Sequence, residues 1–349
     1  MVYRRRAVAF TAVIALGCSA VLLAQKTDKK QTEAQQKDVN AIEKLVDTVA
    51  AGTAQAPNDF GLAWARDDVF KAQGNKEFVP FIVSIDAAKV TGGNVNFYWR
   101  VVPKGAAAPA PATKNDKNKK GSDYPWEDVN LTVPVAAAPN GAHIARSFTV
   151  AAGEYDVYVA CQEPTAPPVK GAPPAAQKVS VLKHTLTVPD FWNNEFSTSS
   201  IVVSRQTTPL PAPLTSQQLV DRPYAAFGAV ELQPTLDSKL FKKDDLQVFF
   251  LIYNPKTDTA NKPAVNVEYN FYAKSGGTEK FFNKTPVLSL NASTLPPQFD
   301  LAQGHQLQGG EDVPLSSFPE GEYRLEIKIT DTLASKTVTR DVNFTVTAS

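Results

Sequence analysis

The chain has 349 residues, of which 43% are hydrophobic, so it is long enough for two domains that each bury a core of their own. Its 36 basic and 35 acidic residues leave a formal net charge of +1. A charge this close to balance produces no field that attracts nucleic acid, so nucleic acid is excluded as an expected partner.

Residues 1–24 are predicted to be a signal peptide or a membrane anchor. Arginines at positions 4–6 precede an apolar run that continues to residue 24, which is the pattern of a bacterial-type export signal. Retention as an anchor is an open alternative, because a membrane-spanning helix needs about 20 apolar residues. Lipidation at Cys18 is another, although Ala15 stands where a lipobox usually has leucine. The protein is expected to be exported to the periplasm, the cell surface or the medium, and to contact the membrane only through this segment.

Residues 25–57 are expected to form a disordered tether with a short amphipathic helix. They are polar and rich in Gln, Lys and Ala, and apolar side chains recur at helical spacing at Val39, Ile42, Val46 and Val49. The partner of this apolar stripe is expected to be the first domain.

Two similar domains are expected because three short motifs occur twice in the same order. The matched segments are 96–100 with 270–274, 153–155 with 321–323, and 186–188 with 344–346. The spacing between the copies shortens along the chain, so the first copy is expected to carry the longer loops. The predicted organisation is a first domain at 58–205, a Pro-rich linker at 206–223 and a second domain at 224–349.

Both copies are predicted to be β-sandwiches. Apolar and polar residues alternate in 95–101, 265–274 and 323–329, which is the period of half-buried strands. Turns rich in glycine and proline separate the apolar runs, and no helical pattern lies between them. The expected fold class is therefore all-β, with two tandem immunoglobulin-like antiparallel β-sandwich domains. The second domain, expressed alone as residues 222–349, is expected to unfold cooperatively.

Tyr155 and Tyr323 are predicted to have a structural role. Each follows Gly-Glu and begins an alternating strand, which resembles the tyrosine corner of immunoglobulin-like and fibronectin-like sandwiches. The disulfide of the immunoglobulin pattern is absent, because Cys18 leaves with a cleaved signal and Cys161 then has no partner in the chain. Cys161 lies on the apolar side of its strand and is expected to be buried.

The first copy contains two Pro/Ala-rich segments, 103–128 and 163–177, and the former includes a cluster of lysines at 114–120. We interpret both as solvated loops. Partner binding by these loops, and anion binding by the lysines, are the open alternatives.

Longer segments resemble a known group of proteins. The runs 186–191, 199–203 and 318–327 look like parts of the accessory β-domains of secreted Acidobacteria-type proteins, which include the GWxTD-domain and von Willebrand factor type A-related groups. The resemblance covers both repeats, but this chain has neither a GWxTD sequence nor the acidic metal-binding loop of a von Willebrand domain. The resemblance implies an exported protein with immunoglobulin-like domains, and it carries over no functional residues.

No catalytic, cofactor or metal site is predicted. The three histidines, His143, His184 and His305, are not spaced as metal ligands, and the sequence contains no Gly-x-Ser-x-Gly or P-loop motif. Adjacent acids such as Asp244-Asp245 are common at turns, so a hydrolase is the least favoured alternative. The expectation is a protein without enzymatic activity.

The function expected is interaction or scaffolding in the cell envelope, since tandem sandwiches serve as rigid spacers and docking modules. The alternative is carbohydrate binding, because exposed aromatic rings provide flat apolar faces for sugars. Trp126 and Trp192 are the candidate ligand contacts, and exposure of both on one face would favour this alternative. The expected partner is an envelope protein or a glycan.

Overall fold

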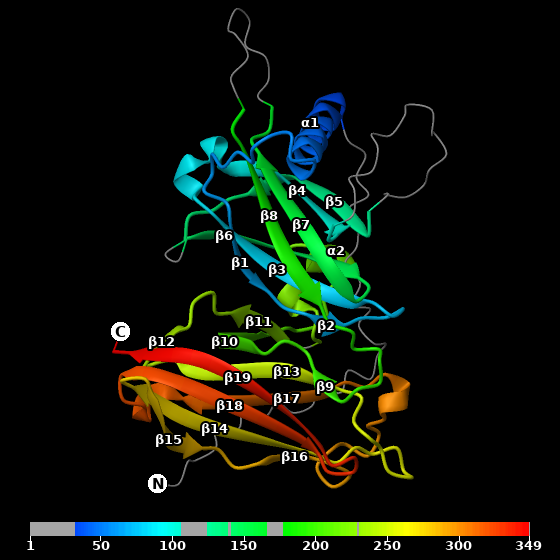
Figure 1. Cartoon of the computed structure of the whole chain (residues 1–349), viewed down its shortest axis with the longest axis vertical. Helices are drawn as coiled ribbons and strands as arrows, with labels where there is room; N and C mark the ends of the chain where they lie inside the picture. Colours follow the sequence, from blue (N-terminus) through cyan, green and yellow to red (C-terminus); the bar gives the residue numbers. More distant parts are fainter. Residues whose placement is uncertain (1–31, 106–123, 139–140, 166–176, 229, 349) are drawn as a thin grey trace, which may run out of the picture. The chain divides into compact units, whose positions relative to one another are not determined.

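The computed structural model describes residues 32–105, 124–138, 141–165, 177–228 and 230–348, which form two compact units (Figure 1). The N-terminal unit contains the described residues of 32–67 and 76–190. The C-terminal unit contains Asp68–Asn75 and the described residues from Phe191 onwards. The predicted signal segment and Cys18 lie outside the described residues, as does most of the lysine-rich loop.

The N-terminal unit consists of one α-helix and two antiparallel sheets. One sheet has the order β1-β3-β6, and the other has the order β5-β4-β7-β8. The elements are α1 (Glu33–Ala50), β1 (Ala63–Asp67), β3 (Glu77–Ile85), the 3₁₀-helices Ala87–Lys89 and Thr91–Gly93, β4 (Asn94–Pro103), β5 (Trp126–Pro134), β6 (Ala142–Val150), β7 (Gly153–Gln162) and β8 (Val179–Val188).

The C-terminal unit also consists of two sheets. One has the order β11-β10-β13-β17 with β9 beside β13, and the other has the order β12-β19-β18-β14-β15 with β16 beside β14. All of these pairs are antiparallel except β12 with β19. The elements are β2 (Phe70–Lys71), β9 (Ser197–Thr198), β10 (Val202–Pro209), α2 (Ser216–Leu219), β11 (Val230–Pro234), β12 (Lys239–Phe241), β13 (Asp245–Tyr253), β14 (Val265–Ser275), β15 (Thr278–Lys284), β16 (Leu288–Leu290), β17 (Leu307–Pro314), β18 (Gly321–Asp331), β19 (Lys336–Thr347) and the 3₁₀-helices Pro223–Ala225, Leu301–Gln303 and Leu315–Ser317.

The two units share one strand order. In each, a central strand of the first sheet (β3 or β13) pairs with β6 or β17, and the second sheet runs β5-β4-β7-β8 or β15-β14-β18-β19. This division of strands between two packed, mainly antiparallel sheets is the immunoglobulin-like arrangement. The predicted fold class, all-β with two tandem immunoglobulin-like sandwiches, is confirmed.

Two of the three repeated motifs occupy equivalent places in the two units. Tyr155 on β7 lies opposite Leu186 on β8, and Tyr323 on β18 lies opposite Phe344 on β19. The similarity of these sequences therefore reflects the same pair of strands in each sandwich.

The remaining match is displaced along its strand. On β4, Asn96 lies opposite Gln162, which is seven residues after Tyr155 on β7. The residue seven positions after Tyr323 on β18 is Thr330, and it lies opposite Asn266 on β14. Asn96 therefore corresponds to Asn266, and its predicted alignment with Asn270 was wrong. An even shift keeps every apolar residue on the same face, so alternation alone does not fix this register.

The structure places the segment predicted as a linker inside the second sandwich. Residues 202–204 of β10 pair with β13, and residues 204–209 pair with β11. The sequence hides this strand because Pro209 ends it and further prolines follow, a composition typical of linkers. The C-terminal unit therefore includes Asp68–Asn75 and residues 191–205, which the predicted boundaries assigned to the first domain. It also includes residues 206–223, which they assigned to the linker.

Segment Asp68–Asn75 is tied to the C-terminal unit by hydrogen bonds and aromatic packing. The Val69 N–H donates to Ser200 Oγ at 2.8 Å, and the Tyr224 hydroxyl donates to Asp68 Oδ2 at 2.7 Å. Phe70 is fully buried, with its ring centroid 4.4 Å from that of Phe227. The chain therefore leaves the N-terminal unit, contributes to the C-terminal one and returns.

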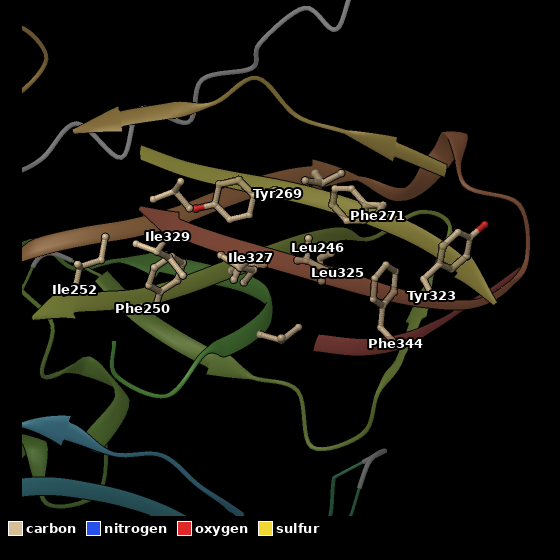
Figure 2. Close-up of a cluster of buried hydrophobic side chains, with 14 of the residues drawn as sticks. Leu246, Phe250, Ile252, Tyr269, Phe271, Tyr323, Leu325, Ile327, Ile329 and Phe344 are labelled. Carbon is tan, nitrogen blue, oxygen red and sulfur yellow. The ribbon is translucent and has the colours of Figure 1, made fainter. Parts of the chain in front are cut away.

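The core of the C-terminal unit lies between its two sheets (Figure 2). Phe250 from β13 meets Ile327 and Ile329 from β18, and Phe271 from β14 approaches Phe344 from β19 edge-on at 6.4 Å. These inward residues occupy alternate positions of their strands, as the period of the sequence predicts.

A buried aromatic residue occupies the same place on β4 of the N-terminal sandwich and on β14 of the C-terminal sandwich. Trp99 on β4 lies opposite Val159, and Tyr269 on β14 lies opposite Ile327, each four residues beyond the corner tyrosine. The Trp99 Nε1–H donates to the Ser147 carbonyl at 3.2 Å. Burial, with the charge of Glu311, raises the pKa of Tyr269 well above its ordinary value. Both rings anchor the two sheets to each other.

Cys161 lies in the core of the N-terminal unit, and its side chain is fully buried. Burial raises the pKa of its thiol. A neutral thiol without access to solvent is unreactive, so Cys161 acts as a small apolar core residue. Separately, none of the helices in the described part of the chain combines the length and apolar character required to cross a bilayer.

The corner tyrosines bond to backbone four residues upstream. The Tyr155 hydroxyl donates to the Ala151 carbonyl at 3.0 Å, and the Tyr323 hydroxyl donates to the Pro319 carbonyl at 2.8 Å. We expect Tyr323→Phe to lower the free energy of unfolding by about 1 kcal/mol, because it removes one hydrogen bond and leaves the ring packing intact. Denaturant unfolding of the two proteins measures this difference, and equal midpoints at equal slopes would contradict it.

Candidate interaction surface

The outer face of β15-β14-β18-β19 in the C-terminal unit carries a concentration of charged and aromatic side chains around one arginine. We call it the Arg324 face, and it consists of Tyr272, Lys274, Glu279, Phe281, Arg324 and Asp341. These positions alternate with the core residues of the same strands, so they point away from the interior.

Arg324 is held by three of its neighbours. Its Nε lies 3.1 and 3.0 Å from the two carboxylate oxygens of Glu279 on β15, and its Nη1 lies 2.6 Å from Asp341 Oδ1 on β19. Its guanidinium carbon stands 4.5 Å from the ring centroid of Tyr272 on β14. Three strands therefore fix one guanidinium from different sides.

The charges of the face stabilise one another. Hydrogen bonds from Arg324 lower the pKa of the Glu279 carboxyl, and the same contact is the main cause that raises the pKa of Arg324. Lys274 adds an ion pair to Glu279 at 3.6 Å and a hydrogen bond to Asn343 at 2.7 Å. Exposed ion pairs contribute little to folding stability, so the main effect of this network is to order the side chains.

An aromatic pair lies beside the arginine. The ring of Phe281 meets the ring of Tyr272 edge-on at 5.9 Å, and 53% of Phe281 is exposed, the largest fraction among the exposed large apolar residues of the described chain. The next residue, Phe282, turns inward against Phe318 and Tyr323. Phe281 therefore presents apolar surface that the fold itself does not use.

The β15 edge is unsuited to pairing with another strand. Among the described strands β15 pairs only with β14, but its register is interrupted by an irregularity at Phe282, and Lys280 and Lys284 are exposed. Bulges and lysines are devices that prevent edge-to-edge pairing. Recognition at this end of the sheet would therefore use the side chains of the Arg324 face.

The corresponding face of the N-terminal unit is covered by its own helix. Ile42 and Val46 of α1 pack against Tyr98 on β4, Tyr158 on β7 and Val181 on β8. The predicted amphipathic helix is thus present, and its apolar stripe lies on the outer side of β4, β7 and β8.

In the C-terminal unit the equivalent positions are polar. Judged from the paired registers, Tyr98, Tyr158 and Val181 correspond to Glu268, Glu326 and Thr339. Glu268 forms an ion pair with Lys328 at 3.1 Å. The two sandwiches therefore use the same face differently: one to bind a helix of the same chain, the other to display ordered polar groups.

The two tryptophans predicted as ligand contacts lie in different units. Trp126 begins β5 opposite Val101 and is 7% exposed, so its ring offers no platform for a sugar. Trp192 is 37% exposed in the C-terminal unit, and the ammonium group of Lys71 lies 4.2 Å from its ring centroid.

The histidines have separate local roles. The ring of His184 stacks on Trp64 at 4.2 Å with its Nε2 3.5 Å from Asp67 Oδ1, and His305 Nδ1 accepts a hydrogen bond from the backbone N–H of Asp300. Burial lowers the pKa of His143. Within the described ranges, no group of three or more His, Cys, Asp or Glu residues is arranged to hold a metal ion.

No protein-family model and no curated protein matches the chain. Among solved structures, the chain is similar to a crystal structure of Salmonella alpha-2-macroglobulin carrying a Y1175G substitution, with 11% identity and a TM-score of 0.20. The match covers 84% of this chain and 17% of the macroglobulin chain.

Proposed function

We propose that the protein is an exported, non-catalytic interaction protein of the cell envelope, and that the Arg324 face is its contact surface for a protein partner. The observation that carries the proposal is the exposed Phe281 ring, which packs edge-on against Tyr272. Tyr272 in turn contacts an arginine that Glu279 and Asp341 also order. The N-terminal export pattern supports the proposed location.

The composition of the face supports recognition of protein. Aromatic residues and arginine are enriched at protein interfaces, and they account for most residues whose loss strongly weakens binding. Ordering a long side chain on binding costs about 0.5–1.5 kcal/mol, and Arg324 is ordered before a partner arrives. The face therefore combines an apolar anchor with a charged group that loses little freedom on binding.

Carbohydrate binding remains the second candidate because Trp192 is partly exposed. Its ring would need a free side for a sugar, and the Lys71 ammonium occupies one side at 4.2 Å. We therefore rank the protein partner first and include a glycan as an outcome of the same test.

The test is affinity capture from the native cell envelope after mild cross-linking, with mass spectrometry of the captured material and of the N-terminus of the bait. Wild type is compared with Phe281→Ala and with Leu333→Ala, which truncates another exposed apolar residue on the β18–β19 turn. We expect one protein to be captured by wild type and by Leu333→Ala. Phe281→Ala should bind it at least about 30-fold more weakly, as for a central aromatic contact.

Equal capture of that protein by all three baits would contradict the Arg324 face as the contact surface. Recovery of glycan without protein, lost in Trp192→Ala, would instead establish the carbohydrate alternative. The mature N-terminus of the bait shows whether residues 1–24 are removed, lipidated at Cys18 or retained.

A further inference from the structure

Helix α1 is fixed to the N-terminal sandwich at its two ends by different polar contacts. Near its start, the buried carboxylate of Asp38 accepts hydrogen bonds from Asn96 Nδ2 at 3.1 Å and from the Thr165 N–H at 3.0 Å, and also from the Thr165 hydroxyl. With three donors, the charge of Asp38 is well satisfied. This end of the helix is firmly held.

The other end is held through one buried arginine. Arg100 on β4 is 4% exposed, and its guanidinium lies 2.5 Å from Asp47 Oδ1 on α1 and 2.9 Å from Glu127 Oε1 on β5. The Tyr98 hydroxyl donates to the same Glu127 oxygen, and the Tyr124 ring centroid lies 4.0 Å from the guanidinium carbon. One positive charge is thus already shared by two carboxylates.

Glu43, one turn before Asp47 on α1, adds a third carboxylate to this cluster. Its pKa is raised to about 6 by burial first and then by the charge of Glu127, while Arg100 acts in the opposite direction and Asp47 adds to the rise. On the β7 and β8 side of the helix, the groups are Tyr158, Asp156 and Lys183. The Lys183 ammonium lies 5.7 Å from the Tyr158 ring centroid and forms an ion pair with Asp156 at 2.9 Å, so its charge is already matched. When Glu43 is ionised, the helix–sheet interface carries more negative charge than Arg100 neutralises.

The rest of the attachment is apolar and of limited extent. The buried residues Ile42 and Val46 meet a strip on the sheet that includes Tyr98, Tyr158 and Ala160. After the helix, residues 51–56 are exposed, so α1 can leave the sheet without breaking a strand.

We propose that α1 is a pH-responsive cover of the outer face of β4, β7 and β8, held closed in mildly acidic surroundings and loosened toward neutral pH. The sign follows from Glu43. The pKa of its carboxyl is about 6 in the docked state and 4.5 for an ordinary glutamate. Between these two pH values the docked helix holds a proton on Glu43 that the released helix gives up. Protonated Glu43 favours docking fully below pH 4.5, and this contribution is lost as the pH rises through 6. Release would expose the apolar strip, and the proposal is independent of the function assigned to the Arg324 face.

Amide hydrogen exchange of the full-length protein at pH 5.0 and pH 7.5 tests the proposal, with each rate corrected for the intrinsic effect of pH. We expect the protection factors of the α1 amides to fall by about fivefold between the two values, after allowance for the partial solvent exposure of Glu43. Amides of β14 and β18 in the other unit are the internal reference.

Two variants assign the effect to this carboxylate. Glu43→Gln has no proton to lose and is expected to give α1 the same protection at both pH values. Glu33→Gln makes the same substitution at an exposed position of the same helix and should behave as wild type. Equal protection of wild-type α1 at both pH values, or an unchanged pH dependence in Glu43→Gln, would overturn the proposal.

Discussion

Removal of residues 191–221 is expected to abolish cooperative unfolding of the C-terminal sandwich. The sequence predicts cooperative unfolding for fragment 222–349, and the structure reverses that expectation. The fragment lacks β9 and β10, which pair with β13 along one side. It also loses Phe196 and Val203 from the core, and burial of each such side chain contributes about 1.5–3 kcal/mol. Losses of this size consume much of the 5–15 kcal/mol by which a typical domain is stable.

The hydrogen bonds lost from β13 add to this effect. The Ser199 N–H donates to the Leu251 carbonyl at 2.9 Å, and the Leu251 N–H donates to Ser199 Oγ at 2.9 Å. Without these partners the buried strand β13 becomes a sheet edge rich in apolar side chains, which favours aggregation.

The measurement compares fragments 222–349 and 191–349 by urea unfolding followed with circular dichroism. We expect a broad, low-amplitude transition or aggregation for the shorter fragment and a single sharp transition for the longer one. A sharp transition at the same midpoint for both would show that β9 and β10 are dispensable for the sandwich.

A single methyl group at Gly309 is expected to destabilise the same unit by about 3 kcal/mol, the upper part of the range for overpacked cores. Gly309 on β17 lies opposite Phe250 on β13, and a Cβ atom at Gly309 would lie 2.3 Å from the ring carbon Cζ of Phe250. Because Phe250 is fully buried among the residues in Figure 2, its ring has no free space to move into.

Thermal and urea unfolding of Gly309→Ala measure this effect, and the double variant with Phe250→Leu is the control. Leucine lacks the far end of the ring, so the substitution at Gly309 should cost markedly less in the Phe250→Leu background than in wild type. Additive losses in the two backgrounds would mean that the clash with Phe250 is not the cause.

The sequence by itself determined the elements whose spacing of apolar side chains is compatible with only one type of secondary structure. Period-two alternation identified β4, β14 and β18 as strands, and Gly-Glu-Tyr marked the start of β7 and β18. The half-buried character is confirmed for β14 and β18 but was wrong for β4, which is buried on both faces because α1 covers its outer side. Helical spacing identified α1, and the apolar side of β7 placed Cys161 in the core. In each case the period of the side chains separates an inner from an outer face without reference to other parts of the chain.

The tertiary structure alone decided what depends on pairing between distant segments. Register moved the equivalent of Asn96 from Asn270 to Asn266, and backbone pairing turned part of a proline-rich linker into β10. The sequence showed the polar side of β18, but only the arrangement of four strands brought Glu279, Asp341 and Tyr272 around Arg324. Alternation specifies which face a side chain occupies, whereas the neighbours on that face are set by strand order and register, which the local sequence does not encode.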